Sequence, residues 1–176
     1  AFPVVIAAAL LGIPVITHEQ TTVPGITNRG MALFAKKICV TFEITLEVFP
    51  KNKVIFTGLP VRKELFEPTA EPPFSVNEAS YPIMYITGGS TGSVSLNALI
   101  FPLIAELTKR FTIIHQTGRL SFADASRMKQ NLPGRQKERY IIRDYFDVYV
   151  VAWIIRHATL IIGRSGANTV TEIAMS

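Results

Sequence analysis

The sequence predicts an α/β protein built from two parallel sheets, each flanked by helices. Short apolar runs of strand length alternate with longer helical stretches along the 176 residues, and this alternation is typical of parallel sheets. A stretch at 67–82 holds four prolines and divides the alternation into two series. We therefore expect a first domain over residues 1–62, a hinge over 63–82 and a second domain over 83–176.

The first series predicts two helices, over 4–11 and 29–37, and three strands, over 13–17, 38–42 and 54–57. The segment 21–28 contains Pro24-Gly25 and reads as a loop. Cys39 is the only cysteine and lies within the second strand. We expect it to be a buried structural thiol, since a lone cysteine in an apolar run is seldom a nucleophile.

The second series predicts four strands, over 83–86, 111–115, 140–142 and 160–163, of which the last is expected to be buried. Helices are expected over 95–109, 122–131 and 146–157, and a basic loop over 133–137. His115 falls inside a strand and His157 near a helix end. Both positions favour structural roles for these two histidines.

Composition narrows the classes of partner. The net charge of +5 and a pI of about 9.5 favour anionic partners. The basic residues are scattered and do not alternate with aromatic ones, which disfavours nucleic acid. Neither a Cys/His cluster nor an Asp-x-Asp motif occurs, so we expect no metal site and no cofactor. The apolar stretch 2–16 is too short and too broken for a spanning helix.

Two segments have the composition of anion-binding turns. Residues 88–93, Gly-Gly-Ser-Thr-Gly-Ser, lead from a strand into a helix, and glycine lets the backbone approach an oxyanion closely. Residues 164–172 also lead from a predicted strand into a predicted helix. Glu172 would lie one turn into that helix, whose first N–H groups are free to bind an anion. A nucleotide fits this combination, because its phosphate can bind the N–H groups while the hydroxyls of its sugar donate to Glu172. The alternatives are an ordinary turn, an exposed acid at Glu172 and an interdomain ion pair at Arg164.

Two further segments carry polar residues at places where ligands bind. Residues 57–62 end in Arg62 at the predicted domain junction, where Arg62 either reaches a ligand or is an ordinary surface residue. His18-Glu19-Gln20 ends a strand. It is either a catalytic or polar-binding group or a hydrogen-bonded loop network. Ser165 lacks the second glycine of a hydrolase nucleophile turn.

In this order and spacing the motifs resemble glycosyltransferase family 28, and within it the peptidoglycan N-acetylglucosaminyltransferases. The resemblance is carried by Leu11-Gly12-Ile13-Pro14, His18-Glu19-Gln20, Pro24-Gly25, Asn28, 58–62, 88–92 with Asn97, and 164–172. Two positions depart from the family pattern. Thr21 stands where the family has Asn, and Leu59 where Asn is common.

The resemblance implies a GT-B fold of two Rossmann-like domains and a metal-independent, inverting transfer. The donor would be UDP-N-acetylglucosamine and the acceptor undecaprenyl-linked muramyl-pentapeptide, at the cytoplasmic surface of an anionic membrane. Gly89 and Ser90 would contact the diphosphate, Arg62 the donor from the hinge, and Val148 the uracil near the start of its helix. Thr21 is carried over as a substrate contact. The nucleotide turn would consist of Ala167, Asn168, Thr169, Val170, Thr171 and Glu172, the last taking the ribose hydroxyls.

The chain opens on Ala1-Phe2-Pro3 and ends in Ala174-Met175-Ser176 without a helix stop signal. We interpret it as an internal fragment, with the family's general base upstream of Ala1, and expect no transferase activity from the 176 residues alone. Two other interpretations stay open. One is a different GT-B enzyme, a UDP-sugar transferase or epimerase; the other is a non-catalytic nucleotide-binding paralogue.

Overall fold

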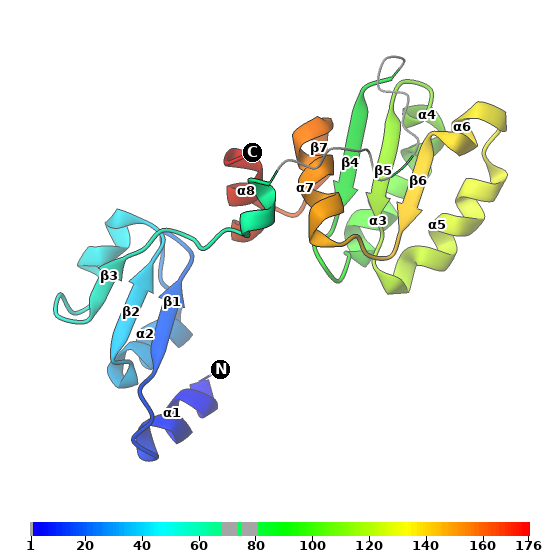
Figure 1. Cartoon of the computed structure of the whole chain (residues 1–176). Coiled ribbons are helices and arrows are strands. Elements are labelled where there is room, and N and C mark those ends of the chain that lie inside the picture. Colours follow the sequence, from blue (N-terminus) through cyan, green and yellow to red (C-terminus); the bar gives the residue numbers. More distant parts are fainter. Residues whose placement is uncertain (1, 68–73, 75–80) are drawn as a thin grey trace. The chain divides into compact units, whose positions relative to one another are not determined.

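The computed structural model describes residues 2–67, 74 and 81–176. The chain divides into two compact units, Ala1–Val61 and Arg62–Ser176, and each contains its own parallel sheet (Figure 1). Most of the predicted hinge over 63–82 falls in 68–73 and 75–80, outside the described residues. Its first part forms a short 3-10 helix, η2 (Lys63–Leu65), which packs against a helix of the second unit.

The first unit is a three-stranded parallel sheet with strand order β1-β2-β3. Its elements are α1 (Phe2–Leu10), β1 (Ile16–Glu19), α2 (Ile26–Phe34), β2 (Lys37–Val40), the 3-10 helix η1 (Glu43–Glu47) and β3 (Val54–Phe56). The buried side chains of its core are Ala32, Ala35, Ile38, Val40 and Phe49. Across the part of the chain that is described, no helix is both long and apolar enough to cross a membrane.

Three predictions for the first unit need correction. Strand β1 begins at Ile16 instead of residue 13, beyond Pro14, which has no N–H to donate to a neighbouring strand. Helix α2 begins at Ile26 instead of residue 29, because Gly25 already serves as its N-cap. Cys39 is only half-buried, since neighbouring residues of a strand point to opposite faces and Ile38 and Val40 take the core face.

The second unit is a four-stranded parallel sheet with strand order β6-β5-β4-β7. Its strands are β4 (Ile83–Thr87), β5 (Thr112–Gln116), β6 (Tyr140–Arg143) and β7 (Ala158–Gly163). Its helices are α3 (Val94–Ile100), η3 (Phe101–Leu103, a 3-10 turn), α4 (Ile104–Leu107), α5 (Arg119–Asn131), α6 (Gly134–Glu138), α7 (Val148–His157) and α8 (Ala167–Ala174).

The side chains of β4 alternate between two helix-covered faces. Met84 and Ile86 face α3, α4 and α5, in a core that also contains Ile100, Ile104, Ile113, Ala125, Leu132, Tyr140 and Ile142. Ile83 and Tyr85 face α7, in a core completed by Ile114, Phe146, Trp153 and Ile154. Because helices cover both faces, every residue of β4 is buried, as its continuous apolar sequence predicts.

Three predictions for the second unit are also wrong in detail. The helix expected over 95–109 is broken by η3, where Pro102 cannot donate a helical hydrogen bond. The expected loop over 133–137 is instead α6, which starts directly after Pro133. Leu160 on β7 is 44% exposed and not buried, because β7 pairs with β4 alone and forms the edge of the described sheet.

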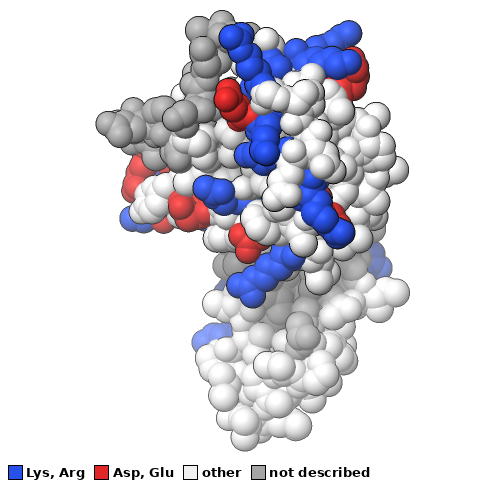
Figure 2. Space-filling model, turned by 90° about the vertical axis from the view of Figure 1, so that its right-hand side faces the viewer, with Lys and Arg blue, Asp and Glu red and all other residues white. Residues whose placement is uncertain are grey.

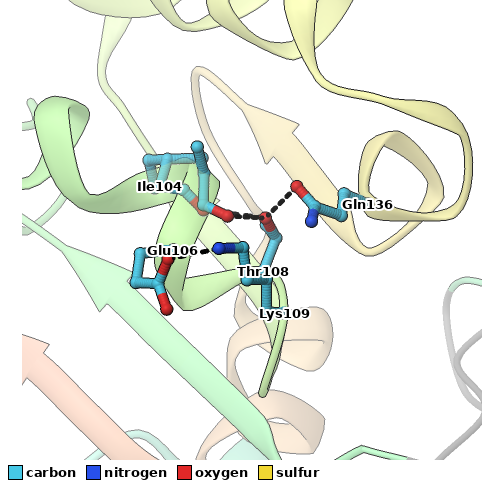
Figure 3. A network of polar contacts seen from close by, with 6 residues as sticks. Ile104, Glu106, Thr108, Lys109 and Gln136 are labelled. Atoms are coloured by element: carbon cyan, nitrogen blue, oxygen red, sulfur yellow. Dashed lines mark hydrogen bonds and ion pairs between the residues drawn. The ribbon is translucent and has the colours of Figure 1, made fainter.

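A polar network ties α4 to α6 at the amino-terminal edge of this sheet (Figure 3). The buried Thr108 hydroxyl donates to the Ile104 carbonyl at 2.8 Å and lies 3.3 Å from Gln136 Oε1. On the neighbouring surface Lys109 Nζ lies 2.6 Å from Glu106 Oε2. The network links α4 to α6 and lies near the amino-terminal end of β5.

His115 lies in the middle of a second buried chain of hydrogen bonds. Asn97 Nδ2 donates to the Thr117 carbonyl at 2.7 Å, so Asn97 Oδ1 accepts from His115 Nε2 at 3.0 Å. Burial lowers the pKa of His115 to about 4, so the ring is neutral near pH 7 and its other nitrogen, Nδ1, accepts from the Tyr140 hydroxyl at 3.0 Å. This arrangement requires a neutral imidazole and ties α3 to the turn after β5, in agreement with a structural role for His115.

Acid is expected to destabilise the protein through His115. Burial lowers the pKa of this ring from 6.5 to about 4. As pH falls below 6.5, the unfolded chain takes up a proton that the folded protein excludes, so unfolding becomes more favourable. Between pH 6.5 and roughly pH 5 the wild type should lose about 1.5 kcal/mol more than His115→Gln. Denaturant titrations at both pH values measure this difference, and equal losses in the two proteins would contradict it.

Candidate functional site

The candidate site lies at the carboxyl-terminal edge of the second sheet, where ligands bind in open parallel α/β sheets. The turn 88–93 follows β4, and Arg164–Gly166 follow β7, so both predicted anion-binding turns reach this edge. The strands β5 and β6 also end there, at Gln116 and Arg143. Parallel register thus gathers segments that are far apart in the sequence.

Glycine shapes the turn after β4. Gly89 and Gly92 adopt φ values of +84° and +77°, which favour glycine. A Cβ on Gly92 would lie 2.4 Å from the Thr117 carbonyl oxygen, and a Cβ on Gly118 would lie 2.3 Å from the Thr91 carbonyl oxygen. The turns after β4 and β5 therefore interlock through their glycines, backbone against backbone.

Replacing Gly92 by alanine is expected to lower the free energy of unfolding by about 2 kcal/mol, since the new Cβ meets backbone and the φ is unfavourable. Gly166→Ala is the matched control, because Gly166 has an ordinary φ of −69° and nothing within 4 Å of the added Cβ. We expect the control to stay within about 1 kcal/mol of wild type. Equal losses for the two variants in denaturant titrations would refute the interlocking of the turns.

Hydrogen bonds to two other residues fix the peptide group between Gly88 and Gly89 in the same turn. The Arg164 guanidinium donates to the Gly88 carbonyl, and the Gly89 N–H donates to Thr87 Oγ1 at 3.0 Å. Ser90 is exposed. Neither its N–H nor its hydroxyl has a hydrogen-bond partner among residues 2–67, 74 and 81–176. Arg164 thus serves the turn itself, and Ser90 is left open to a ligand.

Helix α8 presents free amides at the same edge. Its N-cap is Gly166, which has no side chain to cap the helix, and the first amide to bond within it is Val170 N–H, to the Gly166 carbonyl at 3.0 Å. Within the described ranges, the N–H groups of Ala167, Asn168 and Thr169 donate to no protein acceptor. These amides and the helix dipole favour an anion.

Glu172 is buried, 9% exposed, and forms an ion pair with Arg62. Arg62 Nε and Nη2 lie 2.9 and 2.7 Å from the same oxygen, Oε1. The other oxygen, Oε2, accepts no hydrogen bond from any residue that the structure describes. The ion pair with Arg62 orients the carboxylate and leaves one oxygen available to hydroxyl donors.

Tyr85, on β4, is near enough to this ion pair for both charges to act on its phenol. Burial raises the pKa of the Tyr85 phenol to about 12, and the Glu172 carboxylate acts in the same direction, whereas Thr87 and Arg62 lower it. The phenol therefore stays protonated, and its hydroxyl lies 3.4 Å from Gln116 Oε1. Val148, the predicted uracil contact, is the first residue of α7. Asp147 caps that helix by accepting from the N–H groups of Tyr149 and Val150 at 2.9 and 3.0 Å.

The first unit holds the remaining predicted residues. Glu19 is 3% exposed and accepts hydrogen bonds from the Thr21 N–H and hydroxyl, the Gly25 N–H and Asn28 Nδ2, at 2.7–3.3 Å. Burial acts to raise the pKa of Glu19, but these hydrogen bonds outweigh it and lower the pKa overall. His18 Nε2 lies 3.0 Å from the Gly58 carbonyl oxygen. Glu19 therefore forms a hydrogen-bonded loop network that includes the Thr21 hydroxyl, whereas His18 makes a separate contact with Gly58.

Charge on the second unit is mixed. On the face shown in Figure 2, Lys and Arg side chains are interspersed with Asp and Glu. Exposed pairs such as Lys109–Glu106 and Arg127–Asp124 contribute little stability. In the part of the chain that the structure covers, no three His, Cys, Asp or Glu side chains are grouped to hold a metal ion.

Free amides at a helix start, a glycine turn and a buried acid, all at one edge of a parallel sheet, define an α/β protein with a candidate anion-binding site. The chain belongs to glycosyltransferase family 28. The C-terminal domain of this family matches residues 83–176, and its N-terminal domain matches residues 1–40.

The similar proteins agree with this assignment. Chains from Clostridium tetani and Lachnoclostridium phytofermentans are 35% and 37% identical over 98% of this chain. Both are named UDP-N-acetylglucosamine–N-acetylmuramyl-(pentapeptide) pyrophosphoryl-undecaprenol N-acetylglucosamine transferase. The crystal structure of Acinetobacter baumannii MurG matches 99% of this chain with a TM-score of 0.59 and 30% identity.

The chain spans about half of each of these proteins: 46% of the Clostridium tetani protein, 47% of the Lachnoclostridium phytofermentans protein and 46% of the MurG chain. The likeness to MurG confirms the predicted GT-B type of α/β fold. The family assignment likewise confirms the resemblance drawn from the motifs.

Proposed function

We propose that the whole protein transfers N-acetylglucosamine from UDP-N-acetylglucosamine to the 4-hydroxyl of undecaprenyl-pyrophosphoryl-linked muramyl-pentapeptide. The names of its relatives support this reaction, and the match covers nearly all of this chain. The observation that carries the proposal is Glu172, a buried acid on α8 that is paired with Arg62 and has one oxygen without a hydrogen bond among the described residues, on the helix whose first amides are also unbonded there. An anion next to hydroxyl groups is what the UDP moiety offers.

The proposed donor pose follows from these contacts. The diphosphate lies against Gly89 and Ser90 and against the first amides of α8, from Ala167, Asn168 and Thr169. Glu172 Oε2 accepts the ribose hydroxyls, with Val170 and Thr171 completing the turn of helix beside it. The uracil lies at the start of α7, near Val148. Thr21, in the first unit, is proposed only as a substrate contact by family resemblance, and the use of its hydroxyl by Glu19 argues for an indirect part.

In the proposed reaction the acceptor hydroxyl attacks the anomeric carbon as UDP leaves, with inversion. Negative charge develops on the departing diphosphate. Arg62 and the positive end of α8 supply the compensating charge, so we propose a reaction that does not depend on a metal ion. A base must also take the proton from the acceptor hydroxyl, and we assign none of the described side chains to that step.

The lipid-linked acceptor further places the proposed reaction at a membrane surface. We propose a peripheral location on the cytoplasmic side, where the net charge of +5 would favour anionic headgroups. Nucleic acid is not among the proposed partners.

Calorimetric titration of the whole protein with UDP, followed by a transfer assay, tests the proposal. We expect UDP to bind and the lipid-linked muramyl-pentapeptide to accept the sugar. Transfer to a different acceptor only would favour another GT-B enzyme. Binding of UDP without transfer to any acceptor would favour a non-catalytic paralogue, and no binding of UDP would overturn the donor site.

A further inference from the structure

Gln116, the last residue of β5, contacts both ends of the candidate nucleotide site. It is 3% exposed. Its Nε2 donates to the Gly89 carbonyl at 2.9 Å, and its Oε1 accepts from the Phe146 N–H at 3.3 Å. The Tyr85 hydroxyl lies 3.4 Å from the same Oε1. One side chain therefore links the turn after β4 to the segment that precedes α7.

The contact with Gly89 sets the direction of the next amide. In a trans peptide the C=O of one residue and the N–H of the next point in opposite directions. The Gly89 carbonyl points inward, where it accepts from Gln116 Nε2 and, at 3.0 Å, from the Gly92 N–H. The Ser90 N–H, which shares that peptide plane, must then point away from Gln116. It is among the amides that lack a protein acceptor in the described structure.

The contact with Phe146 acts on the other end of the site. Phe146 is buried in the core beneath α7, two residues before Val148. Since its N–H is held by Gln116, the backbone that enters α7 is fixed relative to the turn at Gly89. Gln116 thus bridges these two segments directly with one side chain, beside the backbone hydrogen bonds from the Thr117 and Gly118 N–H groups to the Arg143 and Asp144 carbonyls.

We infer that Gln116 is a positioning residue for the donor site: it turns the Ser90 N–H toward the diphosphate and fixes that turn relative to the uracil-binding backbone. The inference rests on the proposed function, because it concerns the same UDP site. Gln116 itself touches no part of the ligand in this account. A substitution should therefore act through Ser90, and this distinguishes positioning from a general contribution to stability.

The test compares Gln116→Met with Thr108→Val in the whole protein. Methionine has a similar length but makes neither hydrogen bond. Thr108 is the matched control, since it is fully buried and hydrogen-bonded but lies at the opposite edge of the sheet (Figure 3). Calorimetry measures the Kd for UDP of each variant, alone and combined with Ser90→Pro, which removes the Ser90 N–H, below the melting temperature of each protein.

We expect Gln116→Met to weaken UDP binding about tenfold and Thr108→Val to change it less than about twofold. We also expect the loss in the Gln116→Met/Ser90→Pro double variant to be smaller than the product of the two single losses, because the N–H that Gln116 orients is already absent from the Ser90→Pro protein. Unchanged affinity in Gln116→Met, or losses that simply multiply, would overturn the inference.

Two safeguards keep the test decisive. If Gln116→Met does not fold, Gln116→Asn replaces it, because asparagine keeps the amide but is one carbon too short to reach both Gly89 and Phe146. For this variant too we expect UDP binding to be about tenfold weaker and the effect to be non-additive with the change at Ser90. Wild-type protein that fails to bind UDP would overturn the proposed function, whereas wild-type binding that Gln116 variants share unchanged overturns only this inference.

Discussion

Replacing Glu172 by alanine is expected to weaken the binding of UDP by about 1.5–3 kcal/mol, the usual effect of losing hydrogen bonds to a charged group. The carboxylate is buried, and Arg62 occupies only Oε1, so the variant would lose the oxygen proposed to accept the ribose hydroxyls. It would also leave the Arg62 guanidinium without its partner. Isothermal titration calorimetry of the whole protein measures the change.

Two comparisons make this result specific. Glu106→Ala is the matched control, because Glu106 also pairs with a single cation, at 2.6 Å, but on an exposed surface. It should leave the Kd unchanged. Against 2′-deoxy-UDP, wild type and Glu172→Ala should differ by less than they do against UDP, since one of the hydroxyls is already missing. An unchanged Kd for UDP in Glu172→Ala would remove Glu172 from the ribose site.

Replacing Arg62 by alanine is expected to lower kcat by roughly a hundredfold, the scale seen when one charge-stabilising donor is lost from a transition state. Arg62 carries the only full positive charge that we assign to the departing diphosphate. Its removal would also leave Glu172 as a buried carboxylate with no cation beside it, which loosens the orientation of Oε2. Steady-state assays with UDP-N-acetylglucosamine separate the change in kcat from the change in KM.

The neighbouring Lys63 provides the control for Arg62. Its side chain is 80% exposed and lies 3.7 Å from Glu67, so Lys63→Ala changes the charge of the chain equally without touching Glu172. We expect its kcat to stay within about twofold of wild type. Arg62→Lys should recover part of the activity, because it restores the charge but not the paired N–H groups that reach one oxygen. Equal kcat values for Arg62→Ala and Lys63→Ala would contradict the role of Arg62.

Much of the architecture follows from local patterns in the sequence. The strands β3 to β6 lie within a residue or two of the predicted ranges, because each is a short apolar or β-branched run bounded by turn residues. Two of the predictions for the second unit fail where one proline acts against its surroundings. Pro102 interrupts an otherwise helical stretch, and Pro133 starts α6 where a proline and a glycine together read as a loop. Local composition cannot distinguish these two effects of proline.

The site was predictable in part. Turn glycines, Ser90 and the segment that becomes α8 form contiguous motifs, so their chemistry can be recognised from sequence. The Arg62–Glu172 pair joins residues 110 positions apart and follows from no spacing. Gln116 and Asn97 are single polar residues inside apolar elements, and only the packing of the strands shows which turns they hold. For such residues the one sequence signal is a polar side chain at a position where a core residue is expected.

The most direct test of the central claim is a crystal structure of the whole protein with UDP bound. The account predicts density for the diphosphate against Ser90 and the first amides of α8, with the ribose hydroxyls within hydrogen-bond distance of Glu172 Oε2. A nucleotide bound elsewhere, or bound at this edge with its ribose turned away from Glu172, would contradict the account.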